Sequence, residues 1–81
     1  MDPDTALAEL LDALGQRDWN RVEECSSGLL DWMERSGFPP VTIGPKTLGV
    51  QWHRTVATFV CHAAQSKVND ARKRRQRKES A

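Results

Sequence analysis

The sequence predicts an all-α fold: a small three-helix domain made of a helical hairpin, a proline-rich crossover and a long third helix. Three observations support this prediction. Apolar residues recur at helical spacing in three separate segments, a glycine follows each of the first two, and three of the four prolines fall within residues 39–45. With 81 residues, the chain is expected to form one domain with a modest core.

The first helix is predicted to begin after Asp2 and to stop at Gly15. Asp2 is a suitable N-cap, because its carboxylate can accept a hydrogen bond from a free backbone N–H of the first turn, and Pro3 suits the first helical position. Glycine commonly follows the last turn of a helix. The apolar residues at helical spacing between them are Leu7, Leu10, Leu11 and Leu14.

The second helix is predicted to begin at Asp18, as N-cap, and to end at Gly37 in a left-handed conformation. With a turn of about 100° per residue, its apolar residues share one face. That face consists of Trp19, Val22, Ser26, Leu29, Leu30 and Met33.

The crossover cannot be helical, because its prolines fix the backbone and remove hydrogen-bond donors. We expect an extended segment in which Val41 and Ile43 reach toward the core. The third helix is predicted to start between Pro45 and Leu48 and to run to about Arg75. Its expected core stripe is Leu48, Trp52, Val56, Phe59, Val60 and Ala63.

The third helix also carries a second apolar line, whose spacing from Ala57 onward is typical of coiled coils. Two interpretations are open: the first helix or the crossover covers this line, or it faces a second copy or another protein. Trp32 lies beside the main face of the second helix and is either an exposed anchor or a cap on the core. The candidate partner-binding residues are Val50, Ala57, Cys61, Ala64, Val68 and Trp32.

Charge is divided unevenly along the chain. Residues 1–66 carry five basic and nine acidic groups, a net charge of −4, whereas residues 67–81 carry seven basic and two acidic groups, a net charge of +5. We therefore divide the chain into a domain over residues 1–71 and a basic C-terminal tail over residues 72–81, expected to be frayed or disordered.

The basic segment has three open interpretations: a solvated helix end, a contact for an acidic protein surface, or a nucleic-acid-binding tail. Because it contains no aromatic residue to stack on bases, binding to nucleic acid would be independent of sequence. The candidate residues for this binding are Lys67, Arg72, Lys73, Arg74, Arg75, Arg77 and Lys78.

Residues that could carry chemistry are few. Cys25, His53, Cys61 and His62 have the right types for zinc but not the spacing, and nothing in the sequence pairs a thiol with a base. We expect His53 to be a partly buried, hydrogen-bonded histidine. The sequence thus predicts no enzyme, no cofactor, no metal and no small-molecule substrate.

The sequence also predicts the cellular compartment of the protein. No apolar run is long enough to span a membrane, and the N-terminus lacks a secretion signal. Two cysteines do not make a disulfide framework, so we expect reduced thiols and a cytoplasmic protein with no membrane partner.

Residues 12–30, DALGQRDWNRVEECSSGLL, resemble the middle of a single tetratricopeptide repeat. Asp18 and Trp19 match the turn, Val22 lies three residues after Trp19, and Leu29 and Leu30 lie ten and eleven after it. The resemblance implies a helical hairpin and no substrate. The wider pattern DW…LL.W…GFPP is similar to that of small bacterial proteins of unknown activity.

Together these observations favour a non-enzymatic protein–protein interaction module that forms a homodimer through its third helix or binds another protein. The alternative is an accessory nucleic-acid-binding protein that uses its basic C-terminal tail without sequence specificity.

Overall fold

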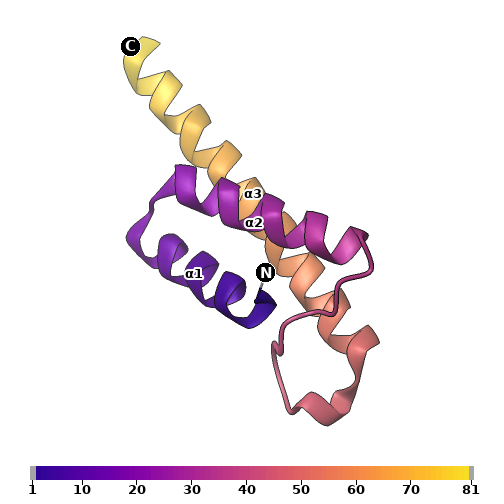
Figure 1. The fold of residues 1–81 in the computed structure, drawn as a ribbon. Helices are drawn as coiled ribbons and strands as arrows, with labels where there is room; N and C mark the ends of the chain where they lie inside the picture. Colours follow the sequence, from indigo (N-terminus) through magenta and orange to yellow (C-terminus); the bar gives the residue numbers. More distant parts are fainter. Residues whose placement is uncertain (1, 81) are drawn as a thin grey trace.

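A computed structural model describes the backbone of residues 2–80 and the side chains of residues 2–75. The predicted all-α, three-helix fold is confirmed (Figure 1). The helices are α1 (Pro3–Gln16), α2 (Trp19–Glu34) and α3 (Val50–Ser80), and a short 3₁₀ turn, η1 (Lys46–Leu48), precedes α3. No strand occurs among the described residues.

α2 is the central helix. It runs antiparallel to α1 and crosses α3, and both of these helices pack along it far more than they pack on each other (Figure 1). The C-terminal turns of α3 extend past the hairpin. The buried core therefore lies around α2, and the side of α3 that faces away from α2 stays open.

α1 begins as predicted. The Asp2 carboxylate accepts a hydrogen bond from the Asp4 backbone N–H at 3.1 Å, and the Thr5 hydroxyl donates to it at 2.7 Å. The hydrogen bond from Thr5 lowers the pKa of Asp2. The predicted stop at Gly15 is wrong by two residues, because the left-handed residue that ends the helix is Arg17, with φ 56°.

One leucine of α1 is placed differently from the prediction. Leu7 and Leu10 are buried and Leu14 packs against the core, but Leu11 is 53% exposed and Ala13 is buried in its place. Only one neighbour, α2, covers α1 closely, so a narrow face is buried, and Leu11 falls outside it.

α2 also begins as predicted, since the Asp18 carboxylate accepts a hydrogen bond from the Arg21 N–H at 3.3 Å. Its predicted end is wrong in one detail: the left-handed residue is Ser36, with φ 67°, and not Gly37. The Gly37 N–H donates to the Trp32 carbonyl at 3.0 Å, which closes the helix end.

The loop over residues 35–49 is extended, but its side chains point the other way from the prediction. Val41 is 41% and Ile43 69% exposed, whereas Pro40 is buried and Thr42 is half-buried. Successive side chains of an extended chain point to opposite sides, so a shift of one residue exchanges the two sets. Thr42 faces inward because it forms hydrogen bonds with His53 of α3.

The two apolar lines of α3 are placed the other way round from the prediction: the expected core stripe is largely exposed, and the second line is largely buried. Within the expected core stripe, Leu48, Trp52 and Phe59 are 46–74% exposed and Ala63 is exposed as well, while Val56 and Val60 are half-buried. The second line, from Ala57 onward, instead faces the core. Small side chains let α2 approach the α3 backbone closely, whereas a tryptophan and a phenylalanine would hold the helices apart.

Candidate interaction surfaces

Four of the candidate partner-binding residues lie in the core of the chain itself. Ala57, Cys61, Ala64 and Val68 are at most 2% exposed and pack with residues of α1 and α2, among them Leu10 and Leu29. These four residues are covered within the chain, but mainly by α2 and not by the first helix or the crossover as the first interpretation had it. Val50, at the start of α3, is 58% exposed.

Trp32 is half-buried and packs against the core, so it caps the core and does not project into solvent. Its indole N–H donates to the Phe38 carbonyl at 2.9 Å, and its ring stands edge-on to Phe38 with the ring centroids 6.0 Å apart. The ring also lies directly against Gly37, where any Cβ would collide with it. Gly37 is thus the glycine that makes room for this tryptophan.

The exposed apolar line of α3 is a more prominent candidate surface than Trp32 or the buried line. Trp52, Val56, Phe59 and Ala63 are spaced by four, three and four residues, which places them on one side of the helix. Phe59 is 74% and Trp52 46% exposed. We call these four residues the α3 apolar face. The sequence could have identified this exposed face, because the small residues of the other apolar line are the ones expected where two helices pack closely.

The crossover extends this face. The Trp52 indole N–H donates to the Ile43 carbonyl at 2.8 Å, which places Ile43, 69% exposed, next to Trp52. The surrounding chain is cationic: residues 35–69 contain four basic groups and not one carboxylate. Within this segment the charged side chains near the α3 apolar face are therefore all basic. Carboxylates of the other helices lie on its borders: Asp4 accepts a hydrogen bond from the Val41 N–H, and Asp31 and Glu34 line a hollow together with Arg54 and His62.

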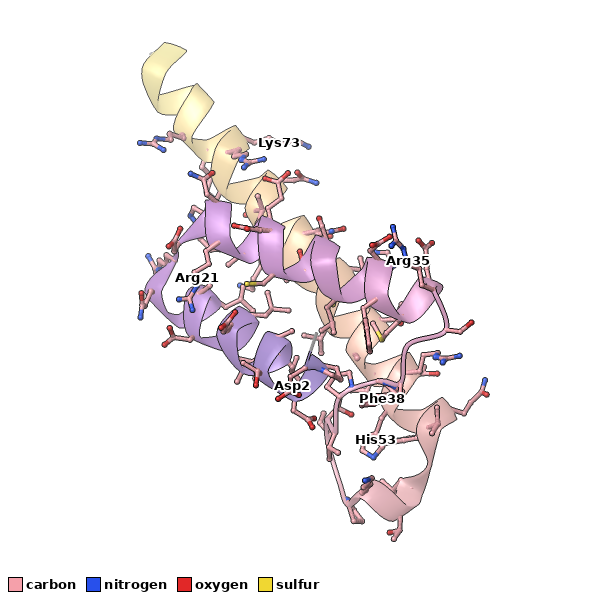
Figure 2. The ribbon with its side chains drawn as sticks, in the orientation of Figure 1. Asp2, Arg21, Arg35, Phe38, His53 and Lys73 are labelled. Carbon is pink, nitrogen blue, oxygen red and sulfur yellow. The ribbon has the colours of Figure 1, made fainter. Side chains whose placement is uncertain are left out.

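His53 fixes the crossover in place beside this face (Figure 2). It is 3% exposed, and its Nδ1 accepts a hydrogen bond from the Thr42 backbone N–H at 3.0 Å. An acceptor at Nδ1 leaves the proton of a neutral ring on Nε2, which donates to the Pro45 carbonyl at 3.0 Å. The prediction of a hydrogen-bonded histidine is confirmed, and both ring nitrogens are used by the fold.

The thiols are not placed for nucleophilic chemistry. Burial raises the pKa of Cys61 to about 11, and burial together with the nearby Glu9 carboxylate raises the pKa of the half-buried Cys25. Both thiols are thus protonated at neutral pH, which makes them less reactive as nucleophiles than an activated cysteine. Within residues 2–75, no three His, Cys, Asp or Glu side chains gather into a metal-binding group.

The basic residues near the C-terminus divide into two sets. Arg72 binds back onto α2, where its guanidinium contacts the Glu23 carboxylate and Asn20, and Arg74 pairs with Asp70 one turn earlier at 3.2 Å. All five basic residues from Lys67 to Arg75 are exposed, but within residues 2–75 no ion pair is formed by Lys67, Lys73 or Arg75. The backbone of α3 passes through residue 72 without a break, and the side chains of Arg77 and Lys78 lie outside the described residues.

A hollow of about 520 Å³ lies where these turns of α3 pass the α1–α2 turn. Arg17 and Trp19 line it from the turn, and Lys67, Asp70, Arg74 and Arg75 line it from α3. A second hollow of about 320 Å³ adjoins it and shares Arg17, Trp19 and Arg75. Sequence reasoning missed this arrangement, because 48 residues separate Trp19 from Lys67 and no local pattern joins them.

No protein-family model, curated protein or solved structure matches the chain. In the part of the chain that the structure describes, no helix is both long and apolar enough to cross a membrane.

Proposed function

We propose that this protein is a non-enzymatic protein–protein interaction module whose α3 apolar face binds an amphipathic helix with acidic flanks. The observation that carries the proposal is the exposure of Phe59 and Trp52, 74% and 46%, on one side of a helix whose other side is fully used by the core. Large exposed apolar side chains that lie together commonly mark interaction sites. Aromatic residues contribute most of the binding energy in such sites.

The spacing of the face indicates the shape of the partner. Apolar side chains spaced by four and three residues form the seam along which two helices pack. Ala63, at the end of the face, leaves room for a close approach. The face spans residues 52–63, so a partner helix of about two heptads would cover it.

Charge indicates the composition of the partner. The face lies within residues 35–69, which carry basic groups and no carboxylates. Lys46 precedes the face in the sequence and Lys67 follows it. Carboxylates beside the apolar residues of a partner would be attracted to this segment, and lysines would be repelled. A second copy presenting the same face would bring like charges together, so we favour a different, acidic protein over a homodimer.

A defined peptide tests this proposal. The probe is a designed amphipathic helix with leucines at the seam and glutamates on both flanks, titrated into ¹⁵N-labelled protein; a matched peptide carries lysines in place of the glutamates. We expect shifts confined to residues 43–63 and at least about tenfold weaker binding of the lysine peptide. Phe59→Ser should abolish binding, whereas His62→Ser, at an exposed position outside the face, should retain it.

Two results would contradict the proposal. Shifts outside residues 43–63, or equal binding of the two peptides, would show that the face does not select an acidic helix. Concentration-dependent self-association in sedimentation experiments, abolished by Phe59→Ser, would identify a second copy as the occupant of the face.

A further inference from the structure

The two hollows beside Trp19 form a second surface, distinct from the α3 apolar face. The larger hollow is lined by four cations, Arg17, Lys67, Arg74 and Arg75, against the single carboxylate of Asp70. Asp70 is already paired with Arg74. The local excess of positive charge is therefore three, drawn from two elements that are far apart in sequence.

Trp19 lies between these cations. Its indole is half-buried against the core and lines both hollows together with Arg17, Ala71 and Arg75. The tryptophan thus presents an aromatic surface at the boundary of two adjoining cationic hollows. Ala71 is the only small side chain of α3 that lines both hollows, and it leaves space beside the ring.

We propose that this surface binds a short stretch of single-stranded nucleic acid. Cationic side chains that follow a phosphate backbone, interleaved with an aromatic ring on which a base stacks, are the combination that single-strand binding requires. The structure supplies the stacking group that the C-terminal turns of α3 lack, because the α1–α2 turn brings Trp19 to them.

The position of the indole favours a single strand over a duplex. A ring half-buried in a hollow cannot reach bases that are stacked and paired inside a double helix, whereas an unpaired base can enter the hollow. Arg17 and Arg75, which line both hollows, can contact the phosphates on either side of that base. Such contacts carry no base-specific hydrogen bonds, so recognition is independent of sequence.

Fluorescence anisotropy of labelled twelve-nucleotide oligomers tests the inference, with the full chain, dT and rU oligomers, and a duplex of equal length. Three neutralised phosphates predict a slope of log K against log salt of about −2 for the single strands. We expect duplex binding to be at least about fivefold weaker than single-strand binding, because the duplex forgoes stacking on Trp19. Arg17→Gln should weaken single-strand binding about fivefold and reduce the slope by about 0.7.

The matched control is Lys73→Gln, which removes the same charge from α3 at an exposed position that lines neither hollow (Figure 2). This change should weaken binding less than about twofold. Trp19→Leu should weaken single-strand binding and leave duplex binding unchanged. Trp19→Phe should retain most of the affinity, and circular dichroism should establish that both variants are folded.

Several results would overturn the inference. Equal losses of single-strand affinity for Arg17→Gln and Lys73→Gln would show that binding is a general attraction between the oligomer and the basic residues of the protein. Equal affinities for the single strand and the duplex would show that stacking on Trp19 does not contribute. Competition by polyglutamate as effective as that by unlabelled oligomer would assign the surface to an acidic protein. Absence of single-strand binding near physiological salt would exclude the site.

Discussion

Thr42 and His53 are joined by two contacts across 11 residues: the backbone N–H and the hydroxyl of Thr42 both lie about 3 Å from Nδ1 of the buried imidazole. The other ring nitrogen contacts the Pro45 carbonyl at 3.0 Å. One side chain at the start of α3 thus satisfies backbone groups on both sides of the bend at Gly44, where φ is +87°. The crossover is held in place by a histidine and not by the valine and isoleucine that the sequence suggests.

Removal of this histidine should loosen the crossover. His53→Ala leaves the Thr42 N–H and the Pro45 carbonyl without their partner and opens a cavity, so we expect it to lower the free energy of unfolding by about 2–4 kcal/mol. Thr42→Val removes only the hydroxyl and should cost about 1 kcal/mol. Urea unfolding followed by circular dichroism gives both values. A decrease in the free energy of unfolding of less than about 0.5 kcal/mol for His53→Ala would show that the hydrogen bonds of His53 with Thr42 and Pro45 do not stabilise the fold.

The exchange of the two apolar lines of α3 is tested by adjacent alanines. Ala64 is 2% exposed and faces α2, whereas Ala63 is exposed on the α3 apolar face. Ala64→Leu should overpack the core and lower the free energy of unfolding by about 1–3 kcal/mol. Ala63→Leu, the matched control, should change it by less than about 0.5 kcal/mol. A larger loss of thermal stability for Ala63→Leu than for Ala64→Leu would show that the line with Ala63, and not the line with Ala64, faces the core.

Two glycines should respond oppositely to the same substitution. A Cβ at Gly15, inside α1, would meet no atom within 4 Å, so Gly15→Ala should raise the free energy of unfolding by about 0.5–1 kcal/mol through helix propensity. A Cβ at Gly37 would collide with the Trp32 ring, so Gly37→Ala should lower it by about 1–3 kcal/mol. Guanidinium unfolding measures both. A stable Gly37→Ala variant would mean that the Trp32 ring moves easily.

Cys61 makes stability depend on alkaline pH. Burial raises the pKa of its thiol from 9.0 to about 11, so between these values the unfolded chain releases a proton that the folded chain keeps. The thiol's contribution to stability is therefore complete below pH 9 and is lost as pH rises toward 11, by up to about 2–3 kcal/mol. Urea midpoints at pH 8 and pH 10.5 measure this loss.

The control for that measurement is Cys61→Ala, which keeps every other titrating group. The variant should be less stable than the wild type at pH 8 because of the small cavity, and it should lose less stability between pH 8 and pH 10.5. Equal losses in the two proteins would mean that other groups cause the alkaline dependence.

The helices and their N-termini could be predicted because these features depend on neighbours in sequence. Asp2 and Asp18 each accept a hydrogen bond from a backbone N–H two or three residues on, so a local pattern is sufficient. The ends of the helices were harder to predict. Arg17, two residues after Gly15, and Ser36, directly before Gly37, adopt the left-handed conformation that a glycine would adopt at lower cost. Tertiary packing determined those positions.

The surfaces could not be predicted to the same degree. Which side of α3 faces inward depends on how many helices cover it, and only α2 covers it closely. The sequence contains the two apolar lines, but their assignment needs the closeness of approach that Ala57, Cys61 and Ala64 permit. The meeting of Trp19 with Lys67 likewise depends on where α3 passes the α1–α2 turn, which is a property of the whole fold.

The central position of α2 has a consequence for how quickly the chain folds. α1 and α2 are adjacent in sequence, and the crossover between α2 and α3 is closed by His53 contacts that span only 8 and 11 residues. The α1–α2 turn and the crossover are therefore short loops, and closing each of them has a small entropic cost. Helical proteins with such local contacts fold within microseconds to milliseconds, and this chain should refold on that timescale.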